Sequence, residues 1–293
     1  MTSLLIYPLP GNDTFALKLS LALSAELGEL ETRTFPDSES YVRLQTPPKD
    51  RDVILVCTLS KPDAKFLRLA FVAAAAKDLG ARSVGLVAPY LAYMRQDIRF
   101  RDGEAISSVT FARLLSSVVD WLVTVDPHLH RRASLSEIYS IPTFLVHAGP
   151  VLADWIKAHV PHPVIVGPDS ESRQWVAEVA ERVDAPYRVL SKSRSGDRSV
   201  SISLPDLSDV ERRQPVLLDD ILSSGRTLSA AGELLNQLAI RKPICVVIHA
   251  LPVPGNTRSL FRLVSTDTIV GPHSRISVIP LLAEAVAKIR QCF

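Results

Sequence analysis

The chain has 293 residues, which is enough for two domains of roughly 150 residues, each with its own core. Hydrophobic residues make up 47% and charged residues 22%, as in an ordinary globular protein, and the formal net charge is only +2. So small a net charge does not predict a broad basic face, and nucleic acid is therefore not an expected partner.

Neither secretion nor membrane insertion is predicted. The longest apolar run, residues 69–76, is far shorter than the roughly 20 residues that span a bilayer, and the first residues lack a basic region and a cleavage site. The three cysteines, Cys57, Cys245 and Cys292, lie far apart and form no CxxC pair. We expect reduced structural thiols in a cytoplasmic protein.

Short β-rich runs alternate with helical patterns along the chain. In the first half the pattern predicts a strand at 52–58, a helix at 66–79, a strand at 83–89, a helix at 107–119 and a strand at 121–125. In the second half it predicts a strand at 164–167, a helix at 171–182, a strand at 216–218, a helix at 228–239 and a strand at 244–250. Apolar strands separated by helices indicate parallel sheets covered on both faces.

Because this pattern occurs twice, we predict an N-terminal domain at 1–146 and a C-terminal domain at 147–293. The Ala-Gly-Pro at 148–150 interrupts the pattern and marks the boundary near residues 146–154. We also expect the helix at about 280–293 to pack back on the first domain. Ligands of α/β sheets bind at the carboxyl ends of the strands. The polar residues that follow predicted strands are Arg95, Gln96, Asp126, His128, Asp169, Asp219 and Asp220.

The strongest motif spans residues 216–227, Val-Leu-Leu-Asp-Asp-Ile-Leu-Ser-Ser-Gly-Arg-Thr. It combines an apolar strand, two acids, a loop of small residues and the start of a helix. The unpaired N–H groups and the dipole of the helix favour an anion such as phosphate, while Asp219 and Asp220 suit the hydroxyls of a sugar diol. A plain helix cap by Ser224 or Thr227 is the alternative, and the adjacent acids favour the phosphate site over it.

This motif resembles the phosphoribosyl pyrophosphate loop of type I phosphoribosyltransferases and of ribose-phosphate pyrophosphokinases. Further segments, spread along nearly the whole chain, resemble the pyrophosphokinases alone. They are the adenine-contacting loop at 35–43, the ATP-phosphate segment at 89–97 and 103–108, the segment with the metal-binding histidine at 124–128, the basic pair Lys192 and Arg194 of a flap, and the ending at 277–285.

The resemblance implies an α/β fold of two similar phosphoribosyltransferase-like domains, each a mostly parallel sheet flanked by helices. It implies transfer of the pyrophosphoryl group of ATP to the 1-hydroxyl of ribose 5-phosphate, with Mg²⁺, in a homo-oligomer. The first domain would bind ATP and the second ribose 5-phosphate. Other interpretations stay open: the same chemistry on another pentose phosphate, a non-catalytic regulatory relative, and a phosphoribosyltransferase.

Site residues follow from the same resemblance. ATP would contact Phe35, Asp37, Glu39, Arg95, Gln96 and His128. Ribose 5-phosphate would contact Asp169, Asp219, Asp220, Ser223, Ser224, Gly225, Arg226 and Thr227. The metal would lie at His128 and Asp169, and Lys192 and Arg194 would be catalytic. His130 has no such support and is expected to be a surface residue.

The chain departs from the family pattern at several positions. Arg226 stands where the family usually has glycine, and it could strengthen phosphate binding or crowd the loop if the backbone there needs a positive φ. Ser223 stands where many members have aspartate, and Glu171 and Ser172 replace small residues beside Asp169.

Overall fold

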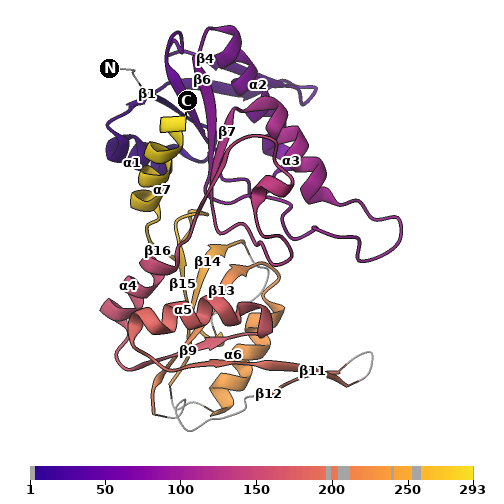
Figure 1. Cartoon of the computed structure of the whole chain (residues 1–293), viewed down its shortest axis with the longest axis vertical. Helices are drawn as coiled ribbons and strands as arrows, with labels where there is room; N and C mark the ends of the chain where they lie inside the picture. The colour runs from indigo at the N-terminus through magenta and orange to yellow at the C-terminus, as the bar shows by residue number, and fades with distance from the viewer. Residues whose placement is uncertain (1–3, 196–198, 204–211, 239–240, 253–258, 293) are drawn as a thin grey trace. The chain divides into compact units, whose positions relative to one another are not determined.

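The computed structural model describes residues 4–195, 199–203, 212–238, 241–252 and 259–292, without the side chains of 174, 191–195, 199–203, 238 and 292. The chain forms two compact units (Figure 1). The first unit comprises Met1–Val146 and Ile279–Phe293, and the second comprises His147–Val278. Among the described residues, no helix combines the length and the apolar character that a membrane crossing requires.

A six-stranded, all-parallel sheet forms the centre of the first unit, in the order β2-β1-β5-β6-β7-β8. Its strands are β1 (Leu4–Pro8), β2 (Glu26–Leu27), β5 (Asp52–Val56), β6 (Ser83–Ala88), β7 (Trp121–Val125) and β8 (Thr143–Val146). Helices α1 (Asp13–Leu23) and α7 (Ile279–Ile289) lie on one side of it, and α2 (Asp63–Asp78) and α3 (Ser107–Val118) on the other (Figure 1). Because both faces are covered, residues 53–56 are fully buried, which is why β5 reads as a continuous apolar run.

Asp52 links three parts of the first unit at the start of β5. Its carboxylate accepts hydrogen bonds from Arg82 Nε at 2.7 Å, Ser83 Oγ at 3.1 Å and Arg290 Nη2 at 2.9 Å. Burial alone would raise the pKa of Asp52, but the hydrogen bonds from Arg82, Arg290 and Ser83 lower it below its ordinary value. Arg290 lies in the turn after α7, so this contact fastens the end of the chain to the central strand.

The second unit repeats the architecture with an all-parallel sheet in the order β10-β9-β13-β14-β15-β16. Its strands are β9 (Pro163–Gly167), β10 (Tyr187–Val189), β13 (Gln214–Leu222), β14 (Ile244–Ala250), β15 (Arg262–Thr266) and β16 (Ser274–Ile276). Its helices are α4 (Gly149–His159), α5 (Arg173–Val183) and α6 (Arg226–Leu238), with a short 3-10 turn at Ser170–Ser172.

Each unit also carries a two-stranded antiparallel hairpin at the same point of its topology. In both, a strand and a helix lead to an edge strand, the hairpin follows, and the chain then returns to the middle of the sheet. The hairpins are β3 (Leu30–Thr34) with β4 (Ser40–Leu44), and β11 (Ser191–Ser195) with β12 (Ser199–Ser203). The predicted α/β class with two similar domains is therefore confirmed.

Three local predictions need correction. The Ala-Gly-Pro at 148–150 is no break, because Gly149 opens α4 and Pro150 occupies its first turn, where proline loses no hydrogen bond. The strand predicted at 216–218 continues to Leu222, so Asp219 and Asp220 lie within β13 and not after it. The helix predicted from Glu171 begins instead as a 3-10 turn, and α5 starts at Arg173.

Candidate active site

Three carboxylates gather at the carboxyl end of the second sheet. The last pair in register between β9 and β13 is Val166 with Leu217, so Asp169 follows the end of β9 beside Asp219 and Asp220. Burial, and then the charges of Asp220 and Asp169, raise the pKa of Asp219 well above its ordinary value. The backbone N–H of Asp220 donates to Asp219 Oδ1 at 3.1 Å. A cluster with this much negative charge favours a ligand that brings hydroxyl donors or a cation.

Asp169 also has a local structural role. Its Oδ1 accepts from the N–H of Glu171 at 3.1 Å, and its carbonyl accepts from Ser172 Oγ at 2.7 Å. Ser172 is buried against Gly167, where an added Cβ would come within 2.3 Å of Ser172 Oγ. The serine that replaces a small residue of the family pattern therefore points back into the fold, and the exposed Glu171 lies in the first turn.

The loop between β13 and α6 has the geometry of an anion site. Gly225 has a φ of +75°, and its carbonyl accepts from the N–H of Ser229 at 2.7 Å as α6 begins. Within residues 223–227, all of which are described, Gly225 alone has a positive φ. Arg226 is therefore not strained, its side chain is exposed, and the possibility that it crowds the backbone is excluded. The loop carries Ser223, Ser224 and Thr227 around the start of a helix of 13 residues.

In the first unit, Phe35, Asp37 and Glu39 form the turn of the β3–β4 hairpin. The N–H of Phe35 donates to the carbonyl of Glu39 at 2.8 Å, and the N–H of Glu39 donates to Asp37 Oδ1 at 3.1 Å. Ser38 adopts a left-handed φ of 74° to close the turn. Phe35 is 38% exposed, so part of the residue is accessible to a ligand.

The sequence did not predict the contacts that Phe35 makes with two neighbouring side chains. The Arg33 guanidinium lies 5.0 Å from the centre of the Phe35 ring and 4.3 Å from that of Tyr41. Arg33 and Tyr41 face each other across the hairpin, and Phe35 is two residues from Arg33, so all three share one face. The alternation of residues 33 and 35 could have revealed this if the hairpin had been recognised. The opposite face is held to α2 by Arg68, whose Nε donates to Ser40 Oγ at 3.3 Å.

The segment after β6 is a loop organised by Glu104. Its Oε2 accepts from the N–H groups of Phe100 at 2.9 Å and Arg101 at 3.1 Å, and from Gln96 Nε2 at 3.3 Å. The Gln96 amide is thus engaged within the loop, whereas the Arg95 side chain is exposed.

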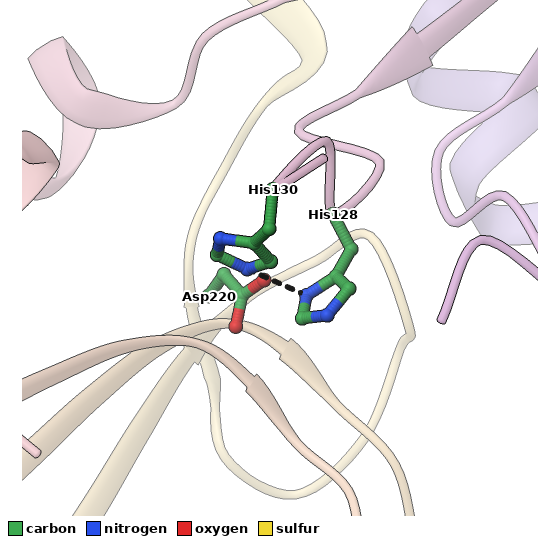
Figure 2. A group of neighbouring side chains, drawn as sticks. All are labelled: His128, His130 and Asp220. Atoms are coloured by element: carbon green, nitrogen blue, oxygen red, sulfur yellow. Dashed lines mark hydrogen bonds between the residues drawn. The ribbon is translucent and has the colours of Figure 1, made fainter. Parts of the chain in front are cut away.

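This loop is tied to the segment that follows β7. Asp97 is only 4% exposed, and both of its oxygens accept from Arg131 Nη1, at 3.0 and 3.2 Å. Next to Arg131, the rings of His128 and His130 approach each other, with His130 Nε2 3.0 Å from His128 Nδ1 (Figure 2). Arg95, Gln96 and His128 therefore belong to one connected part of the first unit.

Lys192 and Arg194 lie in β11, in register with Ile202 and Val200 of β12. The two residues are therefore two positions apart in a strand, as the predicted alternation requires. Their side chains lie outside the part of the chain that the structure describes.

Comparison with known proteins extends over both units. The family model for the N-terminal domain of ribose phosphate pyrophosphokinase matches residues 4–118, and the phosphoribosyl transferase domain model matches residues 134–259. A ribose-phosphate pyrophosphokinase of Saccharolobus solfataricus is 36% identical over 261 residues, which cover 87% of this chain and 88% of the relative. The chain belongs to the ribose-phosphate pyrophosphokinase family.

Other members of the ribose-phosphate pyrophosphokinase family agree with this assignment. The one from Thermoplasma acidophilum is 32% identical over 286 residues, covering 96% of this chain and 98% of the relative. The crystal structure of phosphoribosylpyrophosphate synthetase from Mycobacterium smegmatis superposes over 100% of both chains, with a TM-score of 0.83 at 22% identity. That likeness shows the shared two-domain fold. A phosphoribosyltransferase is not favoured, because the pyrophosphokinase N-terminal domain accounts for most of the first unit.

Proposed function

We propose that the protein is an enzyme that transfers the pyrophosphoryl group of ATP to the 1-hydroxyl of ribose 5-phosphate, giving phosphoribosyl pyrophosphate and AMP. The observation that carries this proposal is the acid cluster and phosphate loop of β13 and α6, found in a chain that matches ribose-phosphate pyrophosphokinases along nearly its whole length.

Ribose 5-phosphate binds the second unit, His147–Val278, in this proposal. Asp219 and Asp220 accept hydrogen bonds from the sugar hydroxyls, which offsets the burial and the repulsion by Asp220 and Asp169 that raise the pKa of Asp219. The 5-phosphate binds the loop Ser223–Thr227, where the backbone N–H groups at the start of α6 and the Arg226 guanidinium both favour an anion.

ATP binds the first unit. The adenine stacks on Phe35, which is exposed at the tip of the hairpin, and Asp37 and Glu39 accept from its exocyclic amine. The phosphates lie near Arg95, Gln96 and His128, on the loops that follow the neighbouring strands β6 and β7.

The reaction is an in-line displacement at the β-phosphorus. The 1-hydroxyl oxygen forms the new bond to that phosphorus, the bond from the β-phosphorus to the oxygen shared with the α-phosphorus breaks, and AMP leaves with that oxygen. The hydroxyl proton passes to solvent. Lys192 and Arg194 of β11 stabilise the charge on the transferring group, since phosphoryl transfer depends mostly on positioning and electrostatics.

The residues present suit Mg²⁺. Mg²⁺ prefers oxygen ligands, and the charge accumulated at Asp169, Asp219 and Asp220 is what a cation would neutralise. Asp169 and His128 are the residues that we propose would hold the metal. When bound with ATP, Mg²⁺ would neutralise phosphate charge.

We also propose a homo-oligomer, which light scattering of the purified protein would test.

An omission experiment tests the function. Purified protein is incubated with ATP, Mg²⁺ and ribose 5-phosphate, and each component is left out in turn. We expect AMP and phosphoribosyl pyrophosphate in equal amounts only when all three are present. ATP binding without either product would refute the proposal and point to a regulatory relative, and product formation only with another pentose phosphate would correct the acceptor.

A further inference from the structure

The segment that follows β7 has an unusual backbone. Asp126 and His128 both have a positive φ, of 31° and 57°, which costs energy for residues other than glycine. The N–H of His128 donates to the carbonyl of Asp126 at 3.0 Å, and the N–H of His130 donates to the carbonyl of His128 at 3.1 Å. These two tight turns in succession bring the side chains of residues 128 and 130 together.

The two imidazoles meet through their ring nitrogens. His130 Nε2 lies 3.0 Å from His128 Nδ1, the ring planes are inclined by 80°, and the ring centres are 4.0 Å apart (Figure 2). Imidazole nitrogens bind metals such as Zn²⁺ at about 2.0–2.1 Å, so two neighbouring ligands stand about 2.9 Å apart at a right angle and about 3.3–3.4 Å apart in a tetrahedral site. The 3.0 Å separation of the two nitrogens fits a right-angled pair of ligands, as in an octahedral site, and a tetrahedral site would require them to move apart by about 0.3–0.4 Å.

Contacts immediately after His130 hold this pair in place. Arg131 Nη1 binds both oxygens of the buried Asp97, and Arg132 Nη2 donates to the Asp97 carbonyl at 3.2 Å. Glu137 Oε1 accepts from the N–H of Ala133 at 2.7 Å and so fixes the chain that follows. A turn anchored directly after His130 retains its strained geometry, and preorganised ligands lose less entropy on binding a metal.

We propose that His128 and His130 form a two-imidazole chelate for a divalent transition metal such as Co²⁺ or Zn²⁺. Imidazole is a preferred ligand of these metals, whereas Mg²⁺ prefers oxygen and is bound poorly by a pair of nitrogens. This proposal gives His130, which lies outside the family pattern, a role as a metal ligand. The chelate depends on the proposed function in one respect, which is that His128 is also proposed to lie near the ATP phosphates.

Titration with Co²⁺ tests the chelate without catalysis. Visible absorption of bound Co²⁺ is followed for the unaltered protein, for His130→Ala and for His162→Ala, with neither ATP nor ribose 5-phosphate present. His162 is an exposed histidine of the second unit and serves as the matched control. We expect His130→Ala to raise the Kd for Co²⁺ at least about 10-fold, and His162→Ala to leave it unchanged. Thermal unfolding of each variant establishes that it is folded.

Equal Co²⁺ affinity of the unaltered protein and His130→Ala would overturn the proposal, as would the absence of Co²⁺ absorption in the unaltered protein. In either case the contact between His128 Nδ1 and His130 Nε2 is a hydrogen bond and not a metal site. Because this titration uses no substrate, it can fail while the omission experiment succeeds, and the reverse is also true. Arg131→Gln provides a second measurement, in which loss of the anchor is expected to weaken Co²⁺ binding while His128 and His130 are retained.

Discussion

Arg226 is the residue at which this chain departs most clearly from its family, and Arg226→Gly would restore the family residue. The backbone at 226 is not left-handed, so glycine relieves no strain there, and the substitution removes mainly a cation at the start of α6. A hydrogen bond to a charged group contributes about 1.5–3 kcal/mol, which corresponds to roughly 10- to 150-fold in affinity. We therefore expect the KM for ribose 5-phosphate to rise by about that factor, with little change in the KM for ATP.

The assay measures initial rates with each substrate varied while the other is saturating. Arg173→Gly is the matched control, because Arg173 is also an exposed arginine at the first position of a helix in the same unit. Arg173→Gly lowers the helix propensity of its position as much as Arg226→Gly does, but it leaves the loop Ser223–Thr227 unchanged. An unchanged KM for ribose 5-phosphate in Arg226→Gly, or an equal rise in Arg173→Gly, would refute the reasoning.

Four further predictions follow from the same structure. Asp220→Asn should raise the KM for ribose 5-phosphate more than that for ATP, and an impaired ATP KM alone would contradict the assignment. Lys192→Ala should lower kcat by orders of magnitude in a protein that unfolds at the same temperature, and near-normal turnover would exclude its catalytic role. Ser38→Gly should stabilise the fold by about 0.5–1 kcal/mol in denaturant unfolding, because Ser38 has a left-handed φ of 74°, and destabilisation would show that its side chain matters more. Asp52→Asn should lower the unfolding free energy at pH 7, and this difference should begin to shrink as the pH falls below the ordinary pKa of 3.8 and be lost as the pH falls through the lowered folded-state pKa of Asp52; a gap that persists below that pKa would contradict this.

The fold was most predictable where strands are buried on both faces. β7 and β14 were located to the residue, since Trp121–Val125 and Ile244–Ala250 are nearly continuous apolar runs ended by polar residues or proline. The local sequence does not predict α4, because glycine and proline at 149 and 150 are typical of a helix break, although proline is well tolerated in a first helical turn. The extension of β13 through Asp219 and Asp220 depends on pairing with β14, as in Ile221 with His249, and such tertiary pairing is invisible in the local pattern.

The site was predictable as a set of segments and less so as a set of contacts. The small-residue loop at Ser223–Thr227 was recognisable because helix starts bind anions by a local mechanism. The Arg33 contact with Phe35 and Tyr41 requires the hairpin register, and the Asp97 contact with Arg131 joins residues 34 positions apart. Sequence spacing alone could suggest neither contact.

The most direct test of the central claim follows the oxygen between the α- and β-phosphorus of ATP. ATP labelled with ¹⁸O at that position is incubated with the protein, Mg²⁺ and ribose 5-phosphate, and both products are analysed by mass spectrometry. Attack of the 1-hydroxyl on the β-phosphorus predicts labelled AMP and an equal amount of unlabelled phosphoribosyl pyrophosphate. Absence of phosphoribosyl pyrophosphate, or label in its pyrophosphoryl group, would contradict the account.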